Sequence, residues 1–160
     1  MEIRNLAPAN IEAIWAINEQ GLPGTGRVSK QEISDLLQFS SLSVGMFDGN
    51  ELFGFVICLP PRTPYGSLNY QWFNDHYNAF VYVDRIAVST LHRNQGVGTK
   101  LYETVVAYSK EKNIPIAAEV NLNPPNPGSI RFHERFHFEQ VGVLHHKEKS
   151  VTMLLREERQ

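Results

Sequence analysis

Residues 79 to 122 carry the pattern that most restricts the fold of this chain. An apolar run, AFVYVDRIAV, ends at residue 88, and a second apolar run, IPIAAEVNL, occupies 114–122. Between them lies a polar loop with two glycines, after which Leu101 and Val105 recur at helical spacing. A strand, a helix and a strand in this order form a crossover unit, so the two strands are predicted to be parallel in one sheet.

The flanking segments add strands and helices to this unit. Five more strands are expected, at 1–6, in a hairpin over 43–59 that turns at Asp48-Gly49, at 138–146 and at 149–157. Further helices are expected from Pro8, after Ser29 and from Pro127. The segment 60–78 contains several prolines and aromatic residues and is predicted to be a long irregular loop. The pattern predicts one α/β domain over 1–160, a mixed sheet of about seven strands flanked by about four helices.

Composition narrows the class of protein. Hydrophobic residues make up 42% of the 160 residues, charged residues make up 20%, and the net charge is -2. These values are typical of a globular protein, and they disfavour a dedicated nucleic-acid binder, which usually has a basic excess. The N-terminus lacks the apolar core of a signal peptide, and the single cysteine, Cys58, forms no intrachain disulfide. We therefore expect a cytoplasmic protein with neither nucleic acid nor membrane as a partner.

The loop RNQGVG at 93–98 is suited to bind an anion. It precedes a helix, so free backbone N–H groups and the positive end of the helix dipole face it. Gly96 and Gly98 lack a Cβ, which lets a phosphate approach, and Arg93 adds a positive charge. The dinucleotide-binding and P-loop fingerprints both fail, because Leu101 replaces the third glycine of the first and Thr99 precedes the lysine of the second. The loop alone is also compatible with a plain helix-entry turn.

Two longer segments resolve this ambiguity by resemblance. DRIAVSTLHRNQGVGTKLYETV and, downstream, NPGSIRFHERFHFEQVG closely resemble the GNAT superfamily of acyl-CoA-dependent N-acetyltransferases, and the order of elements over nearly the whole chain agrees. The resemblance implies acetyl-CoA as co-substrate, with its pyrophosphate in the glycine loop and its pantetheine arm paired with the strand before it. The residues that it assigns to acetyl-CoA are Ile86, Ala87, Val88, Arg93, Asn94, Gln95, Gly96, Val97, Gly98, Thr99, Asn126, Ser129 and Phe132.

Acetyl transfer to an amine requires a base, and two acidic residues are candidates. Glu119 lies within an apolar strand, where burial raises a carboxyl pKa towards neutrality. The resemblance supports Glu119, since some members of the family use a glutamate there. Asp84 also lies in an apolar strand, and we expect Arg85 to project to the opposite face and leave Asp84 free to bind a cationic amine or share the base role. An edge-facing or ion-paired Glu119 is the alternative.

The leaving thiolate of coenzyme A benefits from a proton, and His133 is the candidate acid. It occupies the position where the family commonly has a tyrosine, so a role in covering the cofactor is the alternative. His137 replaces a glycine at the end of the same helix, which predicts a distorted helix end. The two histidines share a helix face but lack further ligands at suitable spacing, so no metal is expected. Cys58 is expected to be buried rather than nucleophilic.

These observations predict an enzyme that transfers acetyl directly from acetyl-CoA to a primary amine of a small molecule. Amino acids, polyamines and antibiotic-like amines are the acceptor classes considered. Two alternatives remain open: a protein N-terminal or lysine acetyltransferase, and a non-catalytic acyl-CoA-binding module. Dimers are frequent in families of this kind, so a homodimer is also allowed.

Overall fold

The computed structural model describes residues 1–23, 25–123, 125–147 and 149–157. Within them lies a seven-stranded sheet in the order β1-β2-β3-β4-β5-β7-β6. Its strands are β1 (Glu2–Asn5), β2 (Leu42–Asp48), β3 (Glu51–Leu59), β4 (Val81–Val88), β5 (Ile116–Asn123), β6 (Glu139–His146) and β7 (Lys149–Arg156). The β4–β5 pair is parallel and the other neighbouring pairs are antiparallel, so the sheet is mixed as predicted.

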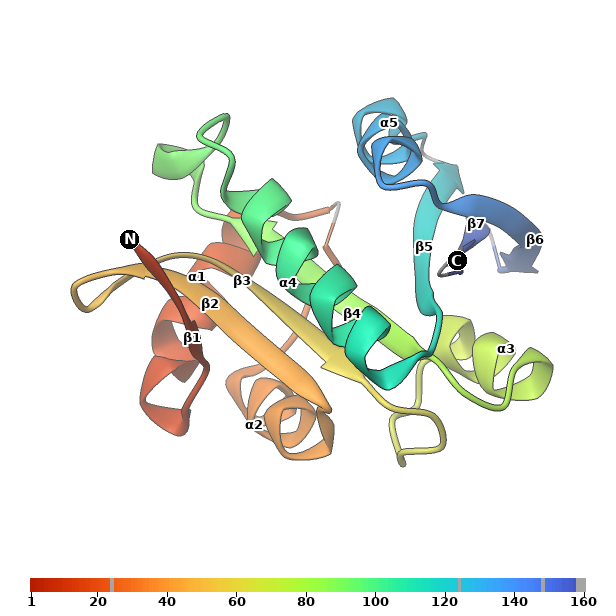
Figure 1. The fold of residues 1–160 in the computed structure, drawn as a ribbon, viewed down its shortest axis with the longest axis horizontal. Helices are drawn as coiled ribbons and strands as arrows, with labels where there is room; N and C mark the ends of the chain where they lie inside the picture. Colours follow the sequence, from red (N-terminus) through yellow and green to blue (C-terminus); the bar gives the residue numbers. More distant parts are fainter. Residues whose placement is uncertain (24, 124, 148, 158–160) are drawn as a thin grey trace.

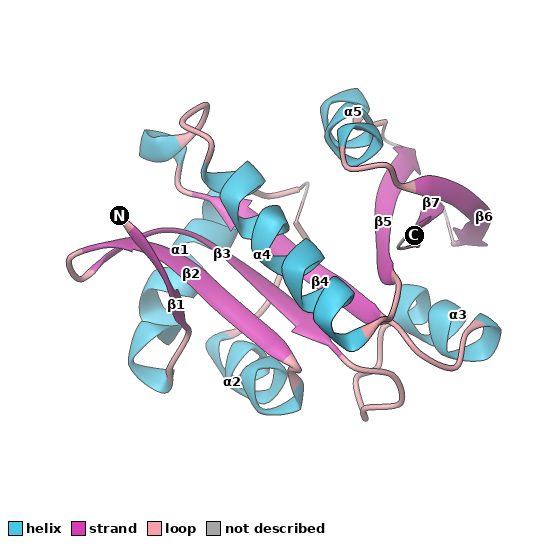
Figure 2. Cartoon of the chain, viewed as in Figure 1, coloured by secondary structure: helices cyan, strands magenta, loops and turns pink. Residues whose placement is uncertain are grey.

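Helices cover both faces of this sheet (Figure 1). The described residues form five α-helices: α1 (Ile11–Gln20), α2 (Lys30–Phe39), α3 (Leu68–His76), α4 (Val97–Lys112) and α5 (Pro127–Arg135). Two short 3-10 turns, η1 (Pro8–Asn10) and η2 (Thr90–His92), precede α1 and follow β4. Figure 2 shows helix α4 lying across one face of the sheet, over β3 and β4.

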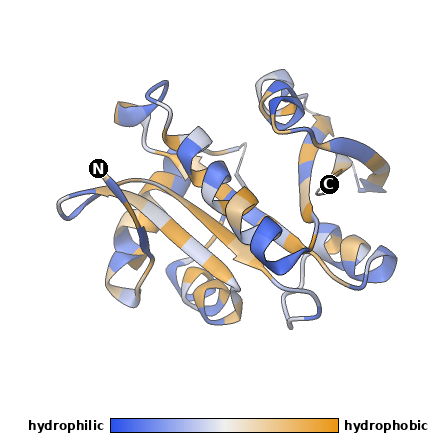
Figure 3. Cartoon of the chain, viewed as in Figure 1, coloured by the Kyte–Doolittle hydropathy of each residue, from blue (hydrophilic) through white to orange (hydrophobic). Residues whose placement is uncertain are grey.

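Two hydrophobic clusters, one on each face, hold the layers together. On one face α1, α2 and α3 bury Ile14, Ile33 and Phe73 against the sheet. On the other face α4 buries Leu101 and α5 packs Phe132. Strand β3 is buried along all but its first residue and is largely hydrophobic in Figure 3. Alternate side chains of β3 and β4 therefore pack into the two clusters on opposite faces, as expected for central strands.

Segment 60–78 was predicted to be irregular, and this prediction was wrong in its second half. Ser67 caps the N-terminus of α3 by accepting a hydrogen bond from the backbone N–H of Tyr70. Tyr70 and Phe73, three apart on the helix, are both fully buried against the sheet. The apolar spacing of this segment was therefore a helix signal that its prolines and high aromatic content obscured. Helix α3 is why the described residues contain five helices rather than about four.

Strands β4 and β5 pair at their beginnings and then separate. In the described part of the chain, their ladder comprises the pairs Val81–Ile116 and Tyr82–Ala117. Opposite β3, the register of β4 shifts between Val83 and Arg85, so Asp84 is the extra residue of a β-bulge. The edge of β4 beyond the bulge is left without β5, and a cleft opens there.

Candidate active site

A cleft of about 630 Å³ occupies the space between the separating strands. Its walls come from β4, the loop that follows it, the start of α4, the middle of β5, and α5 with its N-cap. A further wall comes from the segment between α1 and α2, through Gly21, Thr25 and Gly26. Backbone groups on an open strand edge and at a helix N-terminus therefore face the same space, an arrangement suited to an extended ligand that carries phosphate.

The glycine loop has the geometry of a helix entry with exposed amides. Gly96 is the N-cap of α4 and adopts a left-handed conformation, with φ 79°. Asn94 is also left-handed, with φ 62°. The first helical hydrogen bond runs from the backbone N–H of Lys100 to the carbonyl of Gly96, at 3.0 Å. The amides of residues 97–99 therefore precede the helical ladder and are available to a ligand.

The cleft brings together most of the site residues predicted from sequence. The predicted residues that line it are Asp84, Ile86, Ala87, Val88, Arg93, Asn94, Gly96, Val97, Gly98, Thr99, Glu119, Asn126, Ser129, Phe132 and His133. Gln95 is exposed in the turn and is missing from the described lining. The lining residues that sequence reasoning missed are Gly21, Thr25, Gly26, Val83, Arg85, His92, Tyr102, Ala118 and Arg135.

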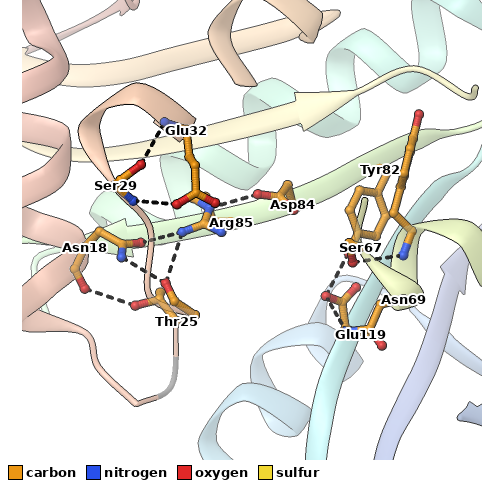
Figure 4. Close-up of polar contacts among 12 residues, drawn as sticks. Asn18, Thr25, Ser29, Glu32, Ser67, Asn69, Tyr82, Asp84, Arg85 and Glu119 are labelled. Atoms are coloured by element: carbon orange, nitrogen blue, oxygen red, sulfur yellow. Dashed lines mark hydrogen bonds and ion pairs between the residues drawn. The ribbon is translucent and has the colours of Figure 1, made fainter. Parts of the chain in front are cut away.

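Glu119 lies on β5 at the edge of this cleft and is held from two sides (Figure 4). The hydroxyl of Tyr82 donates to its Oε1 at 2.8 Å, and the Nδ2 of Asn69 donates to the same oxygen at 3.3 Å. Its Oε2 is buried and has no hydrogen-bond partner among the described residues. Burial raises the pKa of Glu119 to about 8, against the hydrogen bond from Tyr82, which lowers it. A carboxyl group with this pKa and one free oxygen can accept a proton near neutral pH.

Asp84 and Arg85 do not project to opposite faces, so that prediction was wrong. The bulge at Asp84 breaks the alternation of side chains, and the Nε of Arg85 donates to the Oδ2 of Asp84 at 2.8 Å. The side chains are only 3% and 9% exposed for Asp84 and Arg85, respectively. The two charges therefore neutralise each other in a buried ion pair. The sequence carries no sign of this bulge, so the usual alternation of side chains along a strand could not predict that Asp84 and Arg85 lie on the same side.

His133 is buried and both of its ring nitrogens are engaged. Its Nδ1 lies 2.8 Å from the backbone carbonyl of Ser129, an acceptor only, so the ring proton resides on Nδ1. Its Nε2 then accepts a hydrogen bond from the hydroxyl of Tyr102, at 2.6 Å. Burial lowers the pKa of His133, which favours the neutral ring. In this arrangement His133 holds no proton directed at the cleft, which argues against a direct role as acid.

Two smaller expectations, for His137 and Cys58, also have an outcome in the structure. His137 adopts φ 66°, so it takes the left-handed conformation of the usual glycine and the end of α5 is not distorted. Cys58 is fully buried, and burial raises the pKa of its thiol.

Among the described ranges, no group of three or more His, Cys, Asp or Glu side chains is placed to hold a metal ion. In the same ranges, no helix combines the length and apolarity needed to cross a membrane.

Comparison with known families identifies the class of protein that this fold and cleft define. The model of the acetyltransferase (GNAT) family matches residues 11–138. The chain therefore belongs to the acetyltransferase (GNAT) family and is an acyltransferase, as the resemblance of the glycine-loop and α5 segments implied. A comparison with curated protein sequences gave no match.

Solved structures with the same fold are numerous but distant in sequence. NAA60 of Arabidopsis thaliana in complex with acetyl-CoA is 20% identical, with a TM-score of 0.77 over 98% of this chain and 99% of its own. Ard1 from Thermoplasma volcanium is 19% identical, with a TM-score of 0.76 over 97% of this chain and 95% of its own. A ribosomal-protein-alanine N-acetyltransferase from Brucella melitensis is 16% identical, with a TM-score of 0.75 over 99% of this chain and 100% of its own. These similarities establish the fold.

Proposed function

We propose that this protein transfers the acetyl group of acetyl-CoA directly to a primary amine, with Glu119 as the general base. The observation that carries the proposal is the environment of Glu119, a carboxyl group at the cleft. Two donors fix one of its oxygens, and the other is buried without a hydrogen-bond partner in the described part of the chain. An amine attacks only after it loses a proton, since an ammonium has no lone pair. Oε2 is the atom that would take this proton. As the new C–N bond forms, the C–S bond of the thioester would break, and coenzyme A would leave as a thiolate that takes its proton from solvent.

The cofactor would lie along β4 and the glycine loop. The open backbone of Ile86, Ala87 and Val88 would pair with the pantetheine arm, and the backbone N–H of Ile86 would polarise the thioester carbonyl. The amides of residues 97–99 and the charge of Arg93 would hold the pyrophosphate. In support, the NAA60 structure of similar fold contains acetyl-CoA.

The pKa of Glu119 bears on the kind of amine. An α-ammonium has a pKa of about 8, so proton transfer to a carboxylate of pKa about 8 is nearly balanced. For a lysine or polyamine ammonium, with a pKa of about 10.4, proton transfer to Glu119 would cost about 3 kcal/mol of free energy. Asp84 gives no compensating attraction for a polycation, because Arg85 already neutralises it. We therefore favour an α-amine whose carboxyl group is blocked, such as that of an amino amide.

A polypeptide N-terminus is the second candidate acceptor, and one feature of the cleft favours it. A closed aromatic pocket beside segment 60–78 would suit a small amine. No residue of 60–78, all of which the structure describes, lines the cleft, because Tyr70 and Phe73 are buried in the core. In addition, the similar structure from Brucella melitensis is named for acetylation of a ribosomal-protein alanine.

Release of free thiol from acetyl-CoA tests the proposal. Glycinamide, a hexapeptide with a free N-terminal alanine, the same peptide blocked at its N-terminus but bearing a lysine, and spermidine would be compared. Faster release with the two α-amines is expected, and the ratio between glycinamide and the hexapeptide separates the two candidates. Faster release with spermidine or the lysine peptide would contradict the assignment of an α-amine, and calorimetric binding of acetyl-CoA without thiol release from any amine would contradict the reaction.

A further inference from the structure

The ion pair of Asp84 and Arg85 lies at a junction of four segments, because the side chain of Tyr65, between β3 and α3, also interacts with both members of the pair. Besides Asp84, the guanidinium of Arg85 contacts α1, where its Nη1 donates to the Oδ1 of Asn18 at 3.1 Å. The same Nη1 donates to the backbone carbonyl of Gly26, also at 3.1 Å. One buried side chain therefore connects the bulge of β4, helix α1 and the segment that leaves α1.

Asn18 repeats these connections from the other side. It is fully buried, and its Nδ2 donates to the carbonyl of Gly26 at 3.0 Å. The hydroxyl of Thr25 donates to the backbone carbonyl of Asn18, also at 3.0 Å. A few residues later Ser29 and Glu32 form a reciprocal capping box that fixes the start of α2. Residues 25–28 are thus fastened at both ends, as Figure 4 shows.

The fastened segment faces the catalytic side of the cleft. Thr25, Gly26 and Arg85 line the cleft on the side of α1, whereas Glu119 lines it from β5. Figure 4 shows the Arg85 network and the Glu119 network on separate sides of the view, with Arg85 on β4 and Glu119 on β5. The residues assigned to acetyl-CoA lie on β4, α4 and α5, so the segment after α1 borders the remaining part of the cleft.

We propose that Asp84 and Arg85 are positioning residues that hold residues 25–28 as the wall of the acceptor half of the cleft. The acceptor role of this half of the cleft rests on the proposed function, whereas the contacts that hold residues 25–28 do not depend on it. A buried pair is costly to break from one side, because the remaining charge is left uncompensated. Loss of Arg85 also leaves the carbonyl of Gly26 and the side chain of Asn18 without a shared donor, so the segment loses its anchor on the sheet.

Trypsin offers a readout that does not require a known acceptor. Arg27 is exposed within the fastened segment, whereas Val28 is 7% exposed. The Arg85→Met variant keeps the aliphatic stem and removes the contacts, so cleavage after Arg27 in the native protein should accelerate by about tenfold or more. Mass spectrometry of the fragments identifies this site among the others.

Kinetics provides the second readout. With glycinamide and the N-terminal alanine hexapeptide as probes, Arg85→Met should raise the acceptor KM by about tenfold. The dissociation constant of acetyl-CoA, measured by calorimetry, should stay within about twofold of wild type. Arg62→Met is the matched control, since Arg62 also donates to two loop carbonyls, those of Asn78 and Tyr77, but lies outside the described cleft lining. It should leave both readouts unchanged.

A variant without either charge guards against loss of folding. The double variant Asp84→Asn with Arg85→Met buries no unpaired ion, so it should fold better than either single variant yet still show the faster cleavage after Arg27. Wild-type cleavage at Arg27 in this double variant would overturn the inference, as would an equal loss of acetyl-CoA binding and acceptor binding. An absence of turnover with every amine would instead contradict the proposed function and leave the proteolysis result standing.

Discussion

Replacement of Tyr82 by Phe isolates the proton-accepting role of Glu119. The substitution removes the hydroxyl that donates to Oε1 at 2.8 Å, and leaves Asn69, at 3.3 Å, as the remaining donor to that oxygen among the described residues. Tyr82 is fully buried and packs against Tyr70 and Phe73, which a phenylalanine ring can also do. The main loss is therefore a hydrogen bond to the ionised carboxylate.

The size of the effect follows from the strength of that bond. A hydrogen bond to a charged group is worth about 1.5–3 kcal/mol, and one pKa unit corresponds to about 1.4 kcal/mol, so the pKa of Glu119 should rise by about one to two units. From a starting pKa of about 8, roughly a tenth of Glu119 is ionised at pH 7 in the wild type. In the variant this fraction falls to roughly a hundredth or a thousandth. At pH 7, kcat should thus fall by about 10- to 100-fold.

The assay is thiol release at saturating acetyl-CoA and glycinamide between pH 6 and pH 10.5. The wild-type kcat should rise with pH and level off above about pH 8, whereas Tyr82→Phe should reach a similar plateau about one to two pH units later. Tyr108→Phe is the control, since Tyr108 is a half-buried tyrosine of α4 outside the described lining. A loss of rate that is equal at every pH, or a wild-type rate independent of pH between 7 and 9, would refute the assignment of Glu119 as base.

Four further predictions concern Glu119, Gly98 and His137. Glu119→Gln should lower kcat by about 100- to 10,000-fold with unchanged calorimetric affinity for acetyl-CoA, and an unchanged kcat would remove Glu119 from the mechanism. The folded state raises the pKa of Glu119 from 4.5 to about 8, so the contribution of this group to wild-type stability should decline as pH rises through this interval. Glu119→Gln lacks this titration, so its Tm should rise relative to that of wild type between pH 5 and pH 8. Gly98→Ala should preserve Tm, since a Cβ there meets Phe132 only at 3.8 Å, yet raise the KM for acetyl-CoA by crowding the glycine loop; an unchanged KM would argue against that binding mode. His137→Gly should raise stability by about 1 kcal/mol, or about 2–4 °C in Tm, because φ 66° suits glycine, and a lower Tm would contradict this account of the α5 terminus.

The order of strands and the glycine loop could be predicted from sequence because both depend on local patterns. Apolar alternation identifies β2 and β3 around the Asp48-Gly49 turn, and the spacing of Leu101 and Val105 identifies α4. The glycine loop directly follows β4 in the chain, so a sequence motif that identifies the loop also identifies the open edge of β4. The residues proposed for the cofactor therefore fall in one cleft, apart from Gln95.

The partners of the proposed catalytic and positioning side chains could not be predicted, because they come from remote parts of the chain. Asn69 reaches Glu119 across 50 positions, and Arg85 reaches Asn18 across 67. Likewise, no local pattern in the sequence of α4 places the hydroxyl of Tyr102 on His133. Such contacts depend on how the helices pack on the sheet, and no periodicity in a single sequence reveals this packing.

The bulge at Asp84 links the opening of the cleft to the wall that borders it. Strand β4 stops pairing with β5 after Tyr82, and the extra residue follows two positions later. A bulge bends its strand and increases its twist, so the departure from β5 and the free edge beyond it have a common local cause. The same extra residue turns Asp84 and Arg85 to one side, where Arg85 reaches Gly26 and Asn18. A regular strand would alternate these side chains and continue along β5, so the proposed cofactor edge and the proposed acceptor wall would be lost together.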